Sequence, residues 1–249
     1  MKEACGVFGV YAPGRAVSQL VFDGIYALQH RGQESAGMAV SDGQTITVVK
    51  DMGLVTTVFD ERTLSALQGH LGIGHTRYST QGSSDWANAQ PVYRPVGTAG
   101  FALGHNGNLI DTPRLAEEAG MLPGMIGSDS DIVAELLARA CSLEQLPLAP
   151  PASGELVCAL RQVLPSLSGA FSLVLLDALH LYGVRDPHGF RPLCLGRLGP
   201  PDAPEGWAIA SESPALDVIG ATFVRELDPG ELVVIDESGV HSEQLFAEE

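Results

Sequence analysis

The sequence is poor in positive charge. It has 14 lysine and arginine residues against 30 aspartates and glutamates, which gives a formal net charge of −16, and only Lys2 and Lys50 are lysines. Such an acidic chain is repelled by phosphate backbones and by anionic lipid surfaces. The composition therefore argues against nucleic acid and membranes as partners, and an anion that does bind is expected to meet an arginine fork.

Cysteine is scarce as well. Cys5, Cys141, Cys158 and Cys194 are widely spaced and form no Cys-x-x-Cys pair. Neither a zinc site nor a disulfide framework is indicated by this spacing. The seven histidines show no i, i+4 pairing of the metalloprotease type, so the sequence makes no case for a metal.

Long apolar runs are missing too. No run reaches the length of a membrane span, and the N-terminus lacks the apolar core of a signal peptide. A reducing cytoplasm is therefore the expected location.

The residues that are present describe a well-packed globular protein, with 45% hydrophobic and 18% charged residues in 249. Predicted strands outnumber helices and are often joined by tight turns, which favours antiparallel sheets covered by helices over the alternation of a Rossmann fold. Helices are predicted at 15–31, 60–67, 112–120, from 128 onward, 155–164 and 214–219. Strands are predicted at 5–11, 38–41, 45–50, 71–76, 101–104, 170–177, 180–184, 193–195, 207–210 and 231–235.

Cys5 opens the first apolar strand, four residues after the start of the chain. If the leader 1–4 is removed, Cys5 carries both a thiol and a free α-amine. The pKa of such an amine is about 7.7–8.0, so it can accept a proton near neutral pH. Nucleophile and base then belong to one residue. The alternative is a buried structural cysteine, which packs as a small hydrophobe.

Three polar clusters stand at strand ends or helix starts. Arg77 offers a guanidinium fork for a carboxylate, or else is a solvated loop arginine. Asn106 and Gly107 form a donor pair suited to an oxyanion, or else a hairpin turn. Asp129 can hold an ammonium group, or else is only a helix cap. Together with the thiol, these groups suit acyl transfer from a free amino acid.

The motifs that contain these residues resemble those of the class II glutamine amidotransferases, whose glutaminase domain is an N-terminal-nucleophile hydrolase. The resemblance covers nearly the whole chain, from Cys5 to about Phe246. It is carried by the stretches 5–9, 28–37, 74–80, 105–109 and 128–131. It implies an α+β fold, an αββα sandwich with two mostly antiparallel sheets between helical layers.

Two later stretches, 185–193 and 210–213, are similar to the branch of this family that acts in purine synthesis. The residues after Arg77 point the same way, because Tyr78 stands where the glucosamine-phosphate branch typically has tryptophan. Full-length members of the purine branch use the ammonia from glutamine to convert phosphoribosyl pyrophosphate to 5-phosphoribosylamine.

The resemblance implies four catalytic residues. Cys5 attacks the side-chain carboxamide of glutamine, its own α-amine relays the proton, and a thioester forms. Asn106 Nδ2 and the Gly107 N–H stabilise the oxyanion. Arg31 is expected close to the nucleophile, where its charge would favour the thiolate.

It also implies the residues that bind the substrate. Arg77 would bind the α-carboxylate of glutamine and Asp129 its α-ammonium group. The neighbours of Arg77 that complete the predicted binding segment are Tyr78, Ser79 and Thr80.

The sequence predicts a cleavable leader at 1–4 and a glutaminase domain at 5–249. It contains nothing like the phosphoribosyltransferase domain of the purine branch. No cofactor is therefore expected in this chain, because the Mg²⁺ of full-length relatives and the 4Fe–4S cluster of some belong to the absent domain. Full-length relatives are also expected to be homo-oligomers.

Three alternatives remain open at this point. The chain could be the glutaminase domain of another class II amidotransferase, or a free-standing N-terminal-nucleophile amidase that cleaves a different amide. It could also be an uncleaved, non-catalytic regulatory module. The paired carboxylate and ammonium contacts separate the first two, and removal of the leader separates the last.

Overall fold

Strand β1 (Gly6–Tyr11) lies in the middle of the larger of two sheets. The structure is a computed structural model that describes residues 5–78, 85–122, 127–143 and 155–246. All six residues of β1 are buried. Their side chains alternate between two cores: Phe8 and Val10 face a helical layer, whereas Val7 and Tyr11 face the second sheet. Cys5 immediately precedes this strand.

Every strand pairing in the two sheets is antiparallel. The first sheet has the strand order β11 (Thr222–Glu226), β9 (Cys194–Leu198), β10 (Gly206–Ala210), β1, β4 (Leu71–Arg77), β2 (Ser35–Ser41), β3 (Ile46–Met52). The second has the order β13 (Gly239–Gln244), β12 (Glu231–Asp236), β8 (Leu181–Arg185), β7 (Gly169–Leu176), β6 (Phe101–Leu109), β5 (Val92–Arg94).

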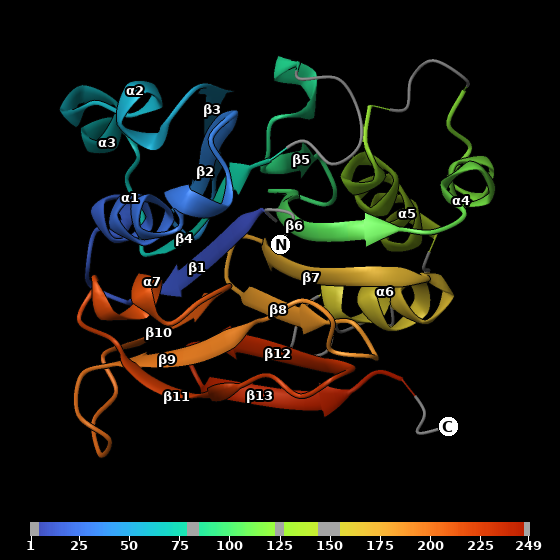
Figure 1. The fold of residues 1–249 in the computed structure, drawn as a ribbon. Helices are drawn as coiled ribbons and strands as arrows, with labels where there is room; N and C mark the ends of the chain where they lie inside the picture. Colours follow the sequence, from blue (N-terminus) through green and yellow to red (C-terminus); the bar gives the residue numbers. More distant parts are fainter. Residues whose placement is uncertain (1–4, 79–84, 123–126, 144–154, 247–249) are drawn as a thin grey trace.

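Helices cover the outer face of each sheet, so the molecule has four layers (Figure 1). The first sheet is covered by α1 (Ser18–Ala27), α2 (Val55–Val58), α3 (Glu61–Ala66) and α7 (Pro214–Asp217). The second is covered by α4 (Thr112–Glu118), α5 (Asp129–Leu143) and α6 (Glu155–Val163). The predicted αββα sandwich is therefore confirmed. None of the helices in the described part of the chain has the length and apolarity needed to cross a bilayer.

Several predicted elements differ in extent from those in the structure. The helix predicted over 15–31 ends at Ala27 and is followed by the 3₁₀ turn η1 (Gln29–Arg31). The stretch 83–95 has the composition of a loop, which predicts one there, but it contains β5 and η2 (Trp86–Asn88). A third 3₁₀ turn, η3 (Leu164–Ser166), follows α6.

Two edge strands, β11 and β13, were not predicted, because their side chains are mostly exposed and show no apolar alternation. Thr112-Pro113 has the pattern of an N-cap followed by proline at the first helical position, which predicts Thr112 as the cap of α4, but this prediction was wrong. Asp111, in a left-handed conformation, precedes the helix, and Thr112 is its first residue. Residues 147–154 are rich in proline, which predicts a connecting loop, and they lie outside the described residues.

Glycine permits the close contact that brings η1 to the end of β4. A Cβ atom added at Gly32, directly after η1, would lie 2.6 Å from the carbonyl oxygen of Thr76. Only glycine fits such a close approach of two backbones. Arg31 is thereby held next to the end of β4 and next to Cys5.

Candidate active site

The thiol of Cys5 lies against the backbone that follows β4. Gly6 pairs with Thr76 between the antiparallel strands β1 and β4, so this register places Cys5 opposite Arg77 and next to Tyr78. The Tyr78 N–H donates to Cys5 Sγ at 3.5 Å, and Sγ is also 3.5 Å from the Tyr78 carbonyl oxygen. Burial raises the pKa of the thiol, and the contacts with Tyr78 and the charge of Arg77 offset only part of this rise. The thiol is therefore neutral at pH 7 and needs a base before it can attack.

Arg31 and Asn106 meet at the backbone carbonyl of Cys5. Arg31 Nε donates to this oxygen at 3.0 Å. The Asn106 carboxamide, oriented so that both of its polar atoms are satisfied, donates from Nδ2 to the same oxygen at 3.2 Å and accepts from Arg31 Nη2 at 3.3 Å. Both predicted catalytic residues thus contact Cys5, through its carbonyl group.

The guanidinium group of Arg31 is also paired with Glu212, which precedes α7. Arg31 Nη1 donates to a Glu212 carboxylate oxygen, and His30 Nε2 lies 2.9 Å from the other. Burial alone would raise the pKa of Glu212, but Arg31 and His30 hold it below its ordinary value. The positive charge of Arg31 is therefore shared between Cys5 and this carboxylate, and its effect on the thiolate stays a prediction.

Asn106 and Gly107 lie in the middle of β6, so the hairpin-turn alternative was wrong. Asn106 pairs with Ser172 and Gly107 with Phe171 on β7. The Asn106 side chain is completely buried. A Cβ atom added at Gly107 would lie 2.0 Å from the Ala170 carbonyl oxygen, so this position requires glycine. The strand continues well beyond the apolar residues 101–104 that predicted it.

Arg77 is the last residue of β4 and is almost completely buried. Its side chain is 5% exposed, and its Nη1 lies 3.5 Å from Glu34 Oε2. The alternative of a solvated loop arginine was therefore wrong. Tyr78 follows directly and contacts the Cys5 thiol, whereas the predicted Ser79 and Thr80 lie outside the described residues.

Asp129 is the first residue of α5, and its carboxylate joins this helix to the end of β6. Asp129 Oδ2 accepts from the Leu109 N–H at 3.1 Å, and Oδ1 accepts from the Ser130 N–H at 2.9 Å and lies 3.6 Å from His105 Nδ1. Ser128, rather than Asp129, caps the helix, because its Oγ accepts from the Asp131 N–H. Capping therefore does not account for Asp129.

The carboxylate of Asp129 interacts electrostatically with the Cys5 thiol. Burial alone would raise the pKa of this carboxyl group, but His105 and two backbone N–H groups lower it below its ordinary value. The same negative charge contributes to the raised pKa of Cys5. An ionised, mostly enclosed carboxylate within electrostatic reach of a thiol is suited to bind the ammonium group of a substrate.

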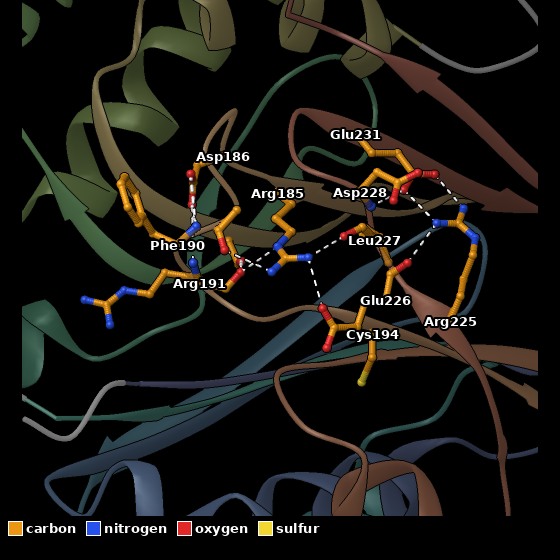
Figure 2. A network of polar contacts seen from close by, with 12 residues as sticks. Arg185, Asp186, Phe190, Arg191, Cys194, Arg225, Glu226, Leu227, Asp228 and Glu231 are labelled. Carbon is orange, nitrogen blue, oxygen red and sulfur yellow. Dashed lines mark hydrogen bonds and ion pairs between the residues drawn. The ribbon is translucent and has the colours of Figure 1, made fainter. Parts of the chain in front are cut away.

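The motif at 185–193 comprises the last residue of β8 and the hydrogen-bonded loop that follows it (Figure 2). The buried carboxylate of Asp186 accepts from the backbone N–H groups of His188 and Phe190. The Arg191 carbonyl oxygen accepts from Arg185 Nε at 2.9 Å and from Ser172 Oγ at 3.1 Å. Because Ser172 pairs with Asn106, this loop supports the strand next to the candidate oxyanion donors.

Sequence reasoning missed three residues that hold the site. Glu34 pairs with Arg77, Glu212 pairs with Arg31, and Ser211 Oγ accepts from the Val7 N–H at 2.9 Å. Ser211 and Glu212 lie in the motif at 210–213, which resembled the family but did not indicate what either side chain contacts.

Comparison with known proteins places the chain among amidotransferases. A family model described as a glutamine amidotransferase domain matches residues 75–218. The amidophosphoribosyltransferase of Mycobacterium leprae is 50% identical over 252 residues, which cover 97% of this chain and 42% of the relative. That of Synechocystis sp. is 46% identical over 247 residues, covering 98% and 48%.

A solved structure agrees with these matches. The glutamine phosphoribosylpyrophosphate amidotransferase of B. subtilis, complexed with ADP and GMP, has a TM-score of 0.84 and 33% identity to this chain. The match covers 98% of this chain and 50% of that one. The chain thus spans about half the length of the relatives that it matches.

Proposed function

This chain belongs to the glutamine amidotransferase family, and from that membership we propose that it hydrolyses glutamine to glutamate and ammonia at Cys5. The observation that carries the proposal is the placement of the Cys5 thiol. The thiol contacts Tyr78, which directly follows the buried Arg77. The Asn106 side chain donates to the backbone carbonyl oxygen of Cys5. The negative charge of Asp129 acts on the thiol.

In the proposed reaction, Cys5 Sγ attacks the side-chain carbonyl carbon of glutamine. The thiol proton passes to the α-amine of Cys5 and from there to the leaving nitrogen, which departs as ammonia. The resulting thioester is hydrolysed by water, which releases glutamate and regenerates the thiol. A base is needed because the pKa of the buried thiol is raised.

The other residues act on charges that the substrate carries or develops. Asn106 Nδ2 and the Gly107 N–H stabilise the negative charge that develops on the oxygen of the tetrahedral intermediate. Arg77 pairs with the α-carboxylate and Asp129 with the α-ammonium group. These two contacts select a free α-amino acid over other amides.

The base is available only after processing. While residues 1–4 remain attached, the nitrogen of Cys5 is an amide and cannot accept a proton. We therefore propose that cleavage of the Ala4–Cys5 bond precedes activity. Intact-mass measurement of active protein should give a chain that begins at Cys5; activity in a sample that contains only the full-length species would contradict this.

We further propose that the ammonia is delivered to phosphoribosyl pyrophosphate, which yields 5-phosphoribosylamine in the first committed step of purine synthesis. The support for this acceptor is the amidophosphoribosyltransferase name of the relatives and the motif at 185–193. The amination itself belongs to a phosphoribosyltransferase part outside the residues of this chain.

A pair of cysteine variants tests the glutaminase proposal. Cys5→Ala should abolish glutamate production, because it removes the thiol that attacks glutamine in the proposed reaction. Cys158→Ala, on α6 in the outer helical layer, is the matched control and should keep wild-type activity. Glutamine hydrolysis by Cys5→Ala at the wild-type rate would refute the proposal.

A further inference from the structure

Two histidines from the family motifs have no task in the proposed reaction. His75 lies on β4 and His105 on β6, and they are 0% and 2% exposed. Buried polar side chains cost stability unless they are hydrogen-bonded. Their contacts should therefore indicate what they do.

His75 joins the two sheets. Its Nε2 lies 3.0 Å from the backbone carbonyl oxygen of His105. A carbonyl oxygen only accepts, so Nε2 carries the proton and donates. Burial lowers the pKa of His75 to about 3, so the ring is neutral. Its Nδ1 has no hydrogen-bond partner among the described residues, and the bond to β6 is thus the one made by the ring there.

His105 is fixed from two further directions. The backbone N–H of His105 donates to Gln90 Oε1 at 2.7 Å, and Gln90 Nε2 donates to Ser130 Oγ at 2.9 Å. The ring of His105 contacts the same serine: its Nδ1 lies 3.1 Å from Ser130 Oγ, and it also lies 3.6 Å from Asp129 Oδ1. Gln90 and Ser130 are 4% and 1% exposed. Segments before β5 and at the start of α5 thus converge on one residue of β6.

Each member of this network adjoins a group that the proposed reaction uses. His75 stands two residues before Arg77, on the same face of β4. His105 directly precedes Asn106, and Ser130 directly follows Asp129. The network therefore connects the groups assigned to the carboxylate, the oxyanion and the ammonium, which come from three different elements.

We propose that His75, Gln90 and Ser130 are positioning residues that hold β4, β6 and the start of α5 together at His105. Ser130 then places Asp129, and the His75 bond places Arg77 and Asn106, in the geometry that fits glutamine. The inference rests on the proposed function and deepens it. These buried hydrogen bonds join the three elements, and removal of one partner leaves another polar group unpaired. Small displacements of such groups reduce catalysis without removing any contact to the substrate.

Ser130→Ala tests the branch of the network that leads to Asp129. The two substrates are glutamine and glutaramic acid, which is glutamine without its α-amine. We expect the KM for glutamine to rise about tenfold and kcat/KM for glutaramic acid to stay unchanged, because only glutamine uses Asp129. The preference for glutamine should fall by the same factor.

The matched control is Ser41→Ala, which removes another buried serine hydroxyl. Ser41 donates to the Ala178 carbonyl oxygen and lies at the end of β2 opposite to the one that pairs with Arg77. It should lower the melting temperature and leave the preference for glutamine unchanged. An unchanged preference in Ser130→Ala would overturn the inference, because a merely structural role affects both substrates alike.

His75 is tested by loss and rescue. His75→Phe removes the donor to β6 and should lower kcat for glutamine about tenfold or more, whereas His75→Gln keeps an N–H donor at a similar place and should restore most of it. Tyr182→Phe, which loses a hydrogen bond to Asp177 at the hairpin between β7 and β8, should lower the melting temperature with kcat unchanged. Equal kcat in His75→Phe and wild type would overturn the inference.

A failure of the inference is distinguishable from a failure of the proposed function. Wild-type protein that does not hydrolyse glutamine contradicts the proposed function. The network itself is read by ¹⁵N NMR of the histidine rings, which should place the proton of His75 on Nε2. A proton on Nδ1 would overturn the inference, whatever the activity.

Discussion

At the scale of the residue, the chemistry of Cys5 depends on neighbours that hold its backbone. Arg31 and Asn106 both donate to its carbonyl oxygen, and Tyr78 meets its sulfur. The pKa of the thiol is raised by burial, so the immediate surroundings do not make it a thiolate. A base has to remove the proton of the thiol, and in the proposed reaction this base is the free α-amine of Cys5 itself.

Asn106→Ala tests the oxyanion assignment. Loss of one such donor typically lowers kcat by about 10²–10³-fold. We expect that loss with little change in KM, because Asn106 would act on the transition state rather than on bound glutamine. Steady-state kinetics with glutamine measure both constants. Asn106→Asp, which has the same size but lacks the donor, should behave alike; a kcat near the wild-type value in both variants would contradict the assignment.

At the scale of the element, β6 carries the most demanding position in the site. Gly107 has no room for a side chain, since an added Cβ atom would meet backbone atoms of β7 at 2.0 Å and 2.7 Å. Gly104 in the same strand does have room, because its nearest neighbours would lie 3.7 Å away. Two glycines of one strand therefore differ in what they tolerate.

Gly107→Ala should lower the free energy of unfolding by about 3 kcal/mol or more and abolish glutamine hydrolysis, because β6 and β7 must separate. Gly104→Ala is the control and should change stability by less than about 1 kcal/mol. Urea unfolding measures both variants. Equal stabilities in the two would mean that the close approach at Gly107 is absent.

The hairpin between β7 and β8 carries a pH-dependent contribution to stability. Asp177 accepts from the N–H groups of Leu179 and His180 and from the Tyr182 hydroxyl. Burial alone would raise the pKa of Asp177, but His180 and Tyr182 lower it below its ordinary value of 3.8. Ionised Asp177 therefore stabilises the fold above that value, and the contribution is lost as pH falls through the lowered folded pKa.

Asp177→Asn should thus be less stable than wild type at about pH 7, by roughly 1–3 kcal/mol, and the gap should narrow at about pH 3. Urea unfolding at the two pH values measures the gap. Asp202→Asn, at an exposed turn, should match wild type at both. If the stability difference between wild type and Asp177→Asn increased as the pH falls, ionised Asp177 would not be stabilising the fold.

The sequence predicted elements where apolar periodicity was strong and missed them where function or exposure replaced it. The apolar start of β6 was predicted, but its continuation through His105, Asn106 and Gly107 was not, because buried polar residues in a strand look like a loop. Strands β11 and β13 are exposed edges without a hydrophobic pattern. Their pairing comes from tertiary context that no local window contains.

At the scale of the whole molecule, the site exists only where the two sheets meet. Cys5 directly precedes β1 and Arg77 ends β4 in the first sheet, whereas Asn106 lies on β6 of the second. Figure 1 shows β1 and β4 beside β6. Asp129 is added from the helical layer beyond the second sheet. Residue types and motifs predicted which side chains belong together, and the resemblance to a family supplied their roles. The contacts through Glu212, Glu34 and the His75–His105 bond could not be predicted, because they join segments far apart in the chain.

The measurement that tests the central claim most directly is covalent labelling with a diazo-ketone analogue of glutamine, followed by peptide mapping. We predict a single adduct on Cys5, in a chain that begins with Cys5, and protection by excess glutamine. An adduct on Cys141, Cys158 or Cys194 would contradict this assignment, and so would continued glutamine hydrolysis by protein whose Cys5 is fully modified.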